Sequence, residues 1–232
     1  MAECYAATMR ILALDGALAC CAAAVVIDDR LVAAHQVRGA RGHAAVLPGL
    51  VEAALAGAGL TAMELDAIAV TIGPGSFTGL RAALALAHGL GTAAGCPVVG
   101  VSVAEAMAAA LPNLGGRELW VAIDNRRGRI FLHRAGQAGG LFAPEPTALD
   151  ALPRAERRIA VAGDAAPEVA SRLAARETDV MLTDLRLPPI RQIALVGAER
   201  LRGERPALPA QPLYVDPPEA RLPQGGLRPA PR

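Results

Sequence analysis

The order of the apolar segments constrains the fold of this chain more than any other feature of its sequence. Short apolar runs at residues 10–14, 20–27 and 31–37 predict three successive strands, with a pair of aspartates forming the turn before the third. Segments with helical spacing then alternate with further short apolar runs. The predicted order of the first half, β-β-β-α-β-α-β-α, is not the strict alternation of a dinucleotide-binding fold.

This order matches the ribonuclease-H-like half-unit of actin, Hsp70 and sugar kinases, so we expect an α/β chain with two lobes. The elements predicted after the first three strands are a helix at 43–56, a strand at 67–72, a helix at 78–90 ended by Gly91 and Gly95, a strand at 97–101, and a helix capped by Ser102 that runs to about Leu111.

The second half of the sequence has weaker periodicity. It predicts a hairpin of strands 118–123 and 129–133 around DNRRG, a strand at 158–162, and helices at 167–175 and 190–202. The expected domains are a tail at 1–8, a first lobe at 9–111, a second lobe at 112–205 and a proline-rich tail at 206–232, with Met1 or Met9 as the start.

The composition limits the classes of function. Hydrophobic residues make up 53% of the 232 residues, which predicts a folded chain with a sizeable core. The net charge of +1 creates no general field for nucleic acid, so an RNA contact must be local or made through a partner. All 23 residues counted as lysine or arginine are arginine, which excludes lysine as a Schiff-base former or general base.

The cysteines and the apolar stretches indicate a soluble, cytoplasmic protein. None of Cys4, Cys20, Cys21 and Cys96 forms a CxxC pair, so we expect reduced, buried thiols and no zinc site. An aspartate interrupts the apolar N-terminal stretch, and two glycines and a proline break the segment 82–111. Neither stretch therefore predicts a membrane span.

A glycine-rich stretch, VTIGPGSFTGLR at residues 70–81, links a predicted strand to a predicted helix. It lacks the lysine and the following hydroxyl of a phosphate-binding P-loop. We expect Gly73 and Gly75 to form a tight turn, Ser76 or Thr78 to cap the helix, and Phe77 to fill the core. Backbone amides at the helix start could in addition attract an anion. The residues of this possible anion or nucleotide contact are Asp15, Gly73, Gly75, Ser76, Thr78, Gly79 and Arg81.

Five segments of the chain resemble the bacterial TsaB family in order and spacing. They read ILALDGA, GHAAVLPGL, TIGPGSFTGLRAALALAHGL, AIDNRRGRIF and PLYVDPPEARLP, and together they cover almost the whole chain from Met9. The resemblance implies an actin-type fold and the role of dimerisation subunit in the synthesis of threonylcarbamoyladenosine in tRNA. It implies pairing with TsaD, which carries the metal and the transfer reaction, and with the ATPase TsaE. The modified atom would be N6 of adenosine 37 in tRNAs that read codons beginning with A.

The resemblance also implies that the chain has lost the catalytic equipment of its fold. The loop after the first strand holds no hydroxyl, and Ala19 stands where glycine would let a phosphate approach. Asp15 could help to hold a hydrated magnesium ion, or it could close the end of the strand, which is the role we favour.

The histidines and serines give no catalytic constellation. The catalytic relative uses two histidines one helical turn apart, whereas here His43 is followed by Leu47 at that spacing. We therefore predict no metal site and expect His43 to be exposed or to cap its helix. The other histidines, His35, His88 and His133, have no comparable spacing. Ser76 lies outside a GxSxG elbow and has no evident base, so we exclude a glycoprotease.

The helix after the glycine loop predicts a partner surface because it is built from small residues with few charges. Small side chains allow a second helix to approach closely. With the helix that begins at His43, it would form one side of a helix–helix interface. The residues of this predicted interface are His43, Val46, Leu47, Leu50, Ala83, Ala87 and His88.

Three motifs depart from the TsaB pattern. Gly16 stands where the family usually has threonine, and the second-lobe motif carries Asn125-Arg126 with Arg129 in place of a glutamate. The tail motif ends in Asp216 in place of an arginine. The two charge changes could preserve an ion pair with reversed polarity.

Together these features predict a non-catalytic scaffold that binds TsaD, and TsaE with it, and contacts tRNA through the complex. It would have no cofactor of its own, because ATP and metal belong to the partner subunits, and a homodimer remains open. The alternative is an ATPase or small-molecule kinase that uses Asp15 and the glycine loop.

Overall fold

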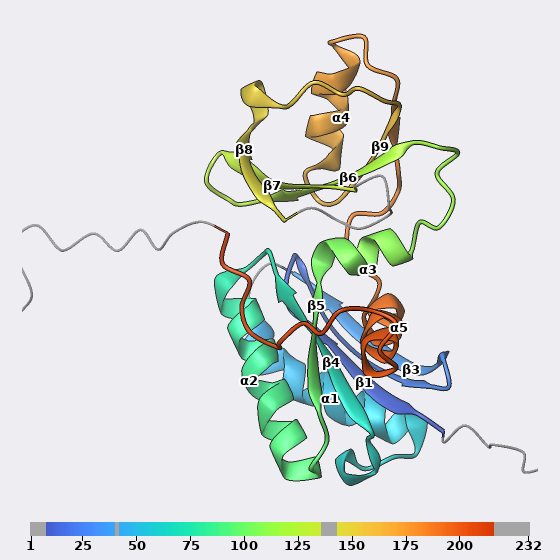
Figure 1. Ribbon diagram of the computed structural model, residues 1–232. Coiled ribbons are helices and arrows are strands. Elements are labelled where there is room, and N and C mark those ends of the chain that lie inside the picture. The colour runs from blue at the N-terminus through green and yellow to red at the C-terminus, as the bar shows by residue number, and fades with distance from the viewer. Residues whose placement is uncertain (1–7, 40–41, 136–142, 216–232) are drawn as a thin grey trace, which may run out of the picture.

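The structure, a computed structural model, describes residues 8–39, 42–135 and 143–215. It consists of two lobes, each built on a five-stranded sheet, stacked along the long axis of the molecule (Figure 1). None of its helices, within those residues, is both long and apolar enough to cross a membrane.

The first lobe has the predicted element order. Its strands are β1 (Arg10–Asp15), β2 (Cys20–Ile27), β3 (Arg30–Arg38), β4 (Ala67–Gly73) and β5 (Val98–Ser102), and its helices are α1 (His43–Ala58), the short 3-10 turn η1 (Ala62–Glu64), α2 (Phe77–Ala94) and α3 (Val103–Ala109). The sheet order is β3-β2-β1-β4-β5. β1, β2 and β3 pair antiparallel, whereas β1, β4 and β5 pair parallel. This is the arrangement expected of a ribonuclease-H-like unit.

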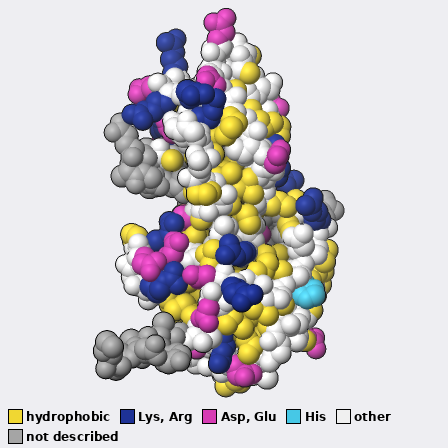
Figure 2. All heavy atoms as spheres, turned by 90° about the vertical axis from the view of Figure 1, so that its right-hand side faces the viewer, with side chains coloured by type: hydrophobic (Ala, Val, Ile, Leu, Met, Phe, Trp, Pro, Cys, Tyr) yellow, Lys and Arg dark blue, Asp and Glu magenta, His cyan; other side chains and the backbone are white. Residues whose placement is uncertain are grey.

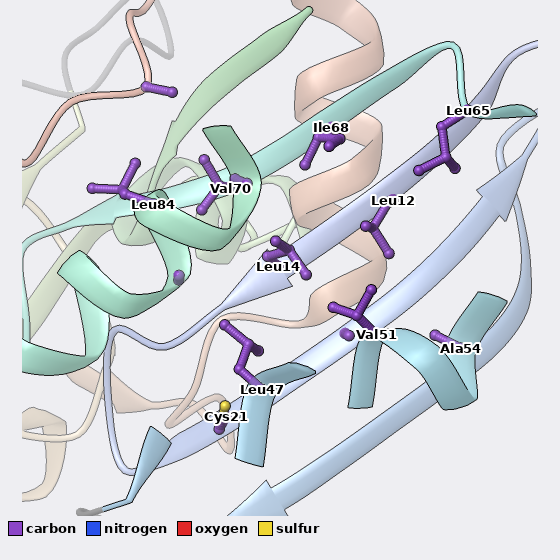
Figure 3. Packing of buried hydrophobic residues seen from close by; sticks show 14 of the residues in the cluster. Leu12, Leu14, Cys21, Leu47, Val51, Ala54, Leu65, Ile68, Val70 and Leu84 are labelled. Atoms are coloured by element: carbon purple, nitrogen blue, oxygen red, sulfur yellow. The ribbon is translucent and has the colours of Figure 1, made fainter. Parts of the chain in front are cut away.

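Helices α1 and α2 lie side by side on one face of this sheet. Leu12 and Leu14 of β1 and Val70 of β4 point into the layer between sheet and helices, where they meet Leu47 and Leu84 (Figure 3). Alternate residues of the same strands face the other side, as the period of two requires. Each strand of the lobe centre is therefore buried on both faces, which explains its continuous apolar sequence.

The second lobe repeats the sheet order of the first. Its strands are β6 (Glu118–Asp124), β7 (Arg129–Arg134), β8 (Glu145–Ala148), β9 (Ile159–Ala162) and β10 (Val180–Leu182), in the order β10-β9-β6-β7-β8, and α4 (Ala166–Ala174) and the 3-10 turn η2 (Leu149–Ala151) complete it. The predicted DNRRG hairpin is confirmed as β6–β7. Two strands were not predicted, because β8 contains proline and glutamate and β10 is only three residues long.

The last helix, α5 (Ile190–Leu201), corrects the predicted domain boundary. It packs on the first sheet, where Ile193 and Val196 are buried with Ile11 of β1. Gly197 lets it approach closely, since a Cβ there would lie 2.6 Å from the Cβ of Ala69. Residues 190–201 thus belong to the first lobe, and the prediction that the second lobe continues to 205 is wrong.

The segment 206–215 follows α5 along the first lobe. The amide of Gly100 donates a 3.0 Å hydrogen bond to the carbonyl of Leu208, and the amide of Leu213 donates a 2.8 Å bond to the carbonyl of Ile72. Ala210 is buried in the core beneath α2. This part of the predicted tail is therefore an integral strap of the lobe, while residues 1–7 and 216–232 lie outside the described residues.

Candidate functional site

The glycine loop and the turn after β1 lie against each other at the start of α2. The amide of Ser76 donates a 2.6 Å hydrogen bond to the carbonyl of Ala17. A Cβ on Gly75 would clash with that same carbonyl, and a Cβ on Gly79 would clash with the carbonyl of Gly16. The glycines thus allow close backbone packing between the two loops, so their first role is structural.

The start of α2 is capped from within the loop. Ser76 is the N-cap, and its hydroxyl accepts a 3.2 Å hydrogen bond from the amide of Gly79. This confirms Ser76 as one of the two predicted caps. Because the amides of Ser76 and Gly79 both donate to protein oxygens, fewer backbone donors are available to an anion than the sequence suggested. The anion contact at Gly73, Thr78 and their neighbours stays a prediction.

Asp15 lies at the end of β1 and is 1% exposed. One carboxylate oxygen, Oδ1, accepts hydrogen bonds from the amide of Ala17 at 3.0 Å and from the hydroxyl of Thr71 at 2.7 Å. Burial raises the pKa of Asp15 to about 6, although the two hydrogen bonds act in the opposite direction. The carboxyl group therefore closes the strand end and ties β1 to β4.

His43 begins α1 but is neither exposed nor a cap, so the expectation from its position is wrong. It is buried, with Nδ1 3.2 Å from the carbonyl oxygen of Gly16 and Nε2 2.9 Å from that of Gly39. Because a carbonyl oxygen only accepts, a neutral imidazole can donate its single N–H to one of these two carbonyls at a time. The ring is enclosed by protein in this conformation. Across the part of the chain that the structure describes, His, Cys, Asp and Glu side chains form no group of three suited to a metal ion.

The structure buries several residues of the predicted partner surface, and the surface itself stays a prediction. Leu47, Ala83 and Ala87 are buried in the core beneath α1 and α2, so they cannot meet a partner. Val46 and Leu50 are half-buried, and His88 is exposed with Nε2 2.8 Å from the carbonyl of Ala210. An alanine-rich helix offers no large apolar stripe, which is why the sequence did not show which alanines face the sheet.

We call the outer side of the two helices the α1–α2 face. Its exposed residues are Ala44, Ala45, Pro48, Gly49, Glu52 and Ala56 of α1, and Phe77, Thr78, Arg81, Ala85, His88, Gly89, Thr92 and Ala93 of α2. Glu52 and Arg81 are the two charged side chains among them. The side on which α5 lies differs, because arginine and carboxylate side chains are scattered there over both lobes (Figure 2).

Phe77 does not fill the core, contrary to the prediction. Its side chain is among the exposed large hydrophobic groups, and the guanidinium carbon of Arg81 lies 3.8 Å from its ring centroid. Arg81 also donates to the hydroxyl of Tyr214, from Nε at 3.3 Å and from a terminal nitrogen at 3.0 Å. Tyr214 lies 133 residues away in sequence, so only its aromatic character within a proline-rich stretch could have suggested it.

The DNRRG turn in the second lobe forms a local charge cluster. Arg126 has φ of +60° and lies near the carboxylates of Asp124 and Asp164, at 3.5 and 3.8 Å. Burial raises the pKa of Asp164, and the neighbouring amide of Asp124 opposes that rise by donating a 2.9 Å hydrogen bond. The suggested pair of Arg129 with Asp216 includes a residue, Asp216, that lies outside the described residues.

Comparison with known sequences places these features in context. Residues 38–143 match the family model described as TsaD: tRNA N6-adenosine threonylcarbamoyltransferase. The chain is 36% identical over 124 residues to the tRNA threonylcarbamoyladenosine biosynthesis protein TsaB of Escherichia coli, a match that covers 53% of each protein. It is 44% identical over 97 residues to the tRNA N6-adenosine threonylcarbamoyltransferase of Paracoccus denitrificans, covering 35% of this chain and 27% of that protein. The chain thus spans about half the length of the curated TsaB that it matches.

Solved structures extend the similarity to nearly the whole chain. YeaZ from Pseudomonas aeruginosa superposes with a TM-score of 0.69 at 27% identity, over 89% of this chain and 99% of that one. A second Pseudomonas aeruginosa structure, titled as an uncharacterized protein with similarity to peptidase YEAZ, gives a TM-score of 0.72 at 26% identity, over 90% and 100%. Both lobes therefore have counterparts in these proteins.

Proposed function

Because the chain is a TsaB/YeaZ-like family member, we propose that it acts in threonylcarbamoyladenosine modification of tRNA as a scaffold subunit that binds a TsaD-type transferase. The observation that carries this proposal is the α1–α2 face. It exposes small, mostly uncharged side chains over two adjacent helices, where a water-facing helix pair normally carries charges. A surface of this kind is suited to close helix–helix contact.

The similarity to the transferase family supports this choice of partner. The matched residues 38–143 include α1 and α2. Two subunits that carry the same pair of helices can pack them against each other about an approximate two-fold axis. The same argument permits a homodimer, in which a second copy of this chain would occupy the α1–α2 face in place of the transferase. A stable interface of ordinary size buries about 1,600 Å² in total.

The state of the loops supports a scaffold role over catalysis. The carboxylate of Asp15 is enclosed and already accepts two hydrogen bonds. The turn after β1 is packed directly on the glycine loop, and both ring nitrogens of His43 lie against protein carbonyls. In this proposal the transferase carries the metal and the transfer step, TsaE supplies ATP hydrolysis, and tRNA is bound through the assembled complex.

Charge insertion on the α1–α2 face tests the proposal. We expect Ala85→Arg in α2 and Ala45→Arg in α1 to abolish co-elution with the TsaD-type transferase in size-exclusion chromatography, while thermal unfolding stays unchanged. Ala174→Arg, at the exposed end of α4, is the matched control and should co-elute as the unmodified chain does. Continued co-elution of both face variants would reject this surface.

The alternative, an ATPase or small-molecule kinase, rests on Asp15 at the end of β1 and on the fold. Isothermal titration calorimetry of the isolated full chain with ATP and Mg²⁺ distinguishes the scaffold hypothesis from the kinase hypothesis. The scaffold proposal expects no saturable binding. Tight binding, lost in an Asp15→Asn variant, would favour the kinase.

A further inference from the structure

Two of the few aromatic side chains in this protein are exposed beside each other. Aromatic residues make up 3% of the chain. Within the described residues Trp120 and Phe131 are buried in the second lobe, whereas Phe77 is 55% and Tyr214 is 58% exposed. Leaving such rings in water forgoes the stabilisation that burial would give, about 25 cal/mol for each Å² of apolar surface. Burial therefore stabilises these two rings less than it stabilises Trp120 and Phe131.

Arg81 holds the two rings together, and we call Phe77, Arg81 and Tyr214 the aromatic–arginine cluster. The guanidinium lies over the Phe77 ring and donates twice to the Tyr214 hydroxyl, and the two ring centroids are 6.2 Å apart. Tyr214 is itself fixed by the preceding strap, because the amide of Leu213 bonds to β4. The cluster is therefore ordered before any partner arrives, which lowers the entropic cost of binding.

The charge of Arg81 has no counterion in the part of the chain that is described. Its hydrogen bonds go to a neutral phenol, and no ion pair joins it to a carboxylate. Neither α2 nor the segment 206–215 contains an aspartate or glutamate. The first turn of α2, one turn before Arg81, adds the positive end of a helix dipole. The cluster thus presents apolar rings next to an unneutralised cation.

We propose that the aromatic–arginine cluster is the anchor of the partner interface, and that it receives a protein segment carrying an apolar side chain next to a carboxylate. This inference rests on the proposed function and adds the strap 206–215 to the interface. Phe77, Arg81, Ala85 and His88 follow one another at helical spacing along the exposed stripe of α2, so the cluster continues the α1–α2 face. Aromatic and arginine side chains dominate the binding energy of protein interfaces.

A protein partner suits the cluster better than RNA does. Base stacking on exposed rings is accompanied in RNA-binding proteins by several cations that track the phosphates. Here Arg81 is the one cation that α2 and the strap provide, apart from the histidine His88. The rest of the face is small and uncharged, as expected of a surface that packs against another protein.

The test measures the Kd of the TsaD-type transferase for cluster variants of the full chain, with thermal unfolding as the check on folding. We expect Phe77→Ala and Tyr214→Ala each to weaken binding by about tenfold or more, and Phe77→Leu to weaken it less because apolar area is kept. Arg81→Gln should weaken binding and also reduce its dependence on salt, since a carboxylate pair is lost. Leu182→Ala, an exposed hydrophobic side chain of β10, is the control and should leave Kd unchanged.

The possible outcomes separate this inference from the proposed function. If Ala85→Arg breaks the complex while the cluster variants keep Kd within twofold, the anchor is rejected and the scaffold role stands. If the unmodified chain does not bind the transferase, both fail. If the cluster variants weaken binding of a labelled RNA stem–loop but not of the transferase, the cluster is an RNA platform and the inference is overturned.

Discussion

The hydroxyl of Thr71 donates a 2.7 Å hydrogen bond to the carboxylate of Asp15, joining β4 to the end of β1 inside the first lobe. Both side chains are buried, and burial dominates the ionisation of the carboxyl group. A site that evolved to hold a cation would be expected to leave such a carboxylate open to solvent or ligand. This one faces protein donors.

The raised pKa of Asp15 predicts a specific pH dependence of stability. The folded value is about 6 and the ordinary value is 3.8, so the folded state binds the proton more tightly. The group therefore stabilises the fold below pH 4, and this contribution is lost as pH rises through 6, a change of about 3 kcal/mol. Asp15→Asn removes the titration. Urea unfolding should show the variant gaining stability relative to the unmodified chain between pH 4 and pH 7, whereas a constant difference would contradict the assignment.

Replacing either of two glycines of α2 by alanine is expected to change the stability of the fold, in opposite directions. A Cβ on Gly79 would clash with the carbonyl of Gly16 and lie 2.5 Å from Nδ1 of His43, while a Cβ on Gly89 meets nothing within 4 Å. Gly79→Ala should destabilise the fold by about 2 kcal/mol or more, because the loops must separate. Gly89→Ala should stabilise it by up to about 1 kcal/mol through helix propensity. Chemical denaturation of both variants checks the pair; equal effects would mean that the loops do not pack as described.

Substitution of two alanines, two residues apart on α2, tests which side of this helix is buried and which is exposed. Ala83 is fully buried and Ala85 is exposed. Ala83→Arg places an unpaired charge in the core and should lower the free energy of unfolding by about 4 kcal/mol or prevent folding. Ala85→Arg should change it by less than about 0.5 kcal/mol. Thermal melts monitored by circular dichroism would refute the assigned helix face if the two variants melted alike.

The ion pair of Arg200 with Glu105 joins α5 to α3, and we expect it to contribute to the stability of the first lobe. The Arg200 side chain is 4% exposed, and Glu105 also completes the capping box of α3 with Ser102. Arg200→Met should cost about 3 kcal/mol, because a largely buried carboxylate loses its partner. The double variant with Glu105→Gln should recover part of that loss, as a double-mutant cycle in urea would show. Full additivity of the two single effects would indicate that the pair is not coupled.

Local patterns in the sequence were sufficient for the first lobe and for the caps. Three apolar runs followed by alternating segments predict the order from β1 to α3, because strand and helix periods are properties of neighbouring residues. The sequence predicts Ser102 as a cap, and Ser76 as one of two candidates, for the same reason, since a cap bonds within three residues.

Long-range packing decided what local patterns could not. Alanine is small and apolar on every side of a helix, so the direction of Ala83 and Ala85 depends on where the sheet lies. The return of α5 to the first sheet, the exposure of Phe77 and the contact between Arg81 and Tyr214 each depend on segments distant in the chain. Local sequence determined most of the helices and strands. The tertiary structure determined which of their surfaces stay exposed for a partner, because the side of a helix that is buried depends on where the sheet lies.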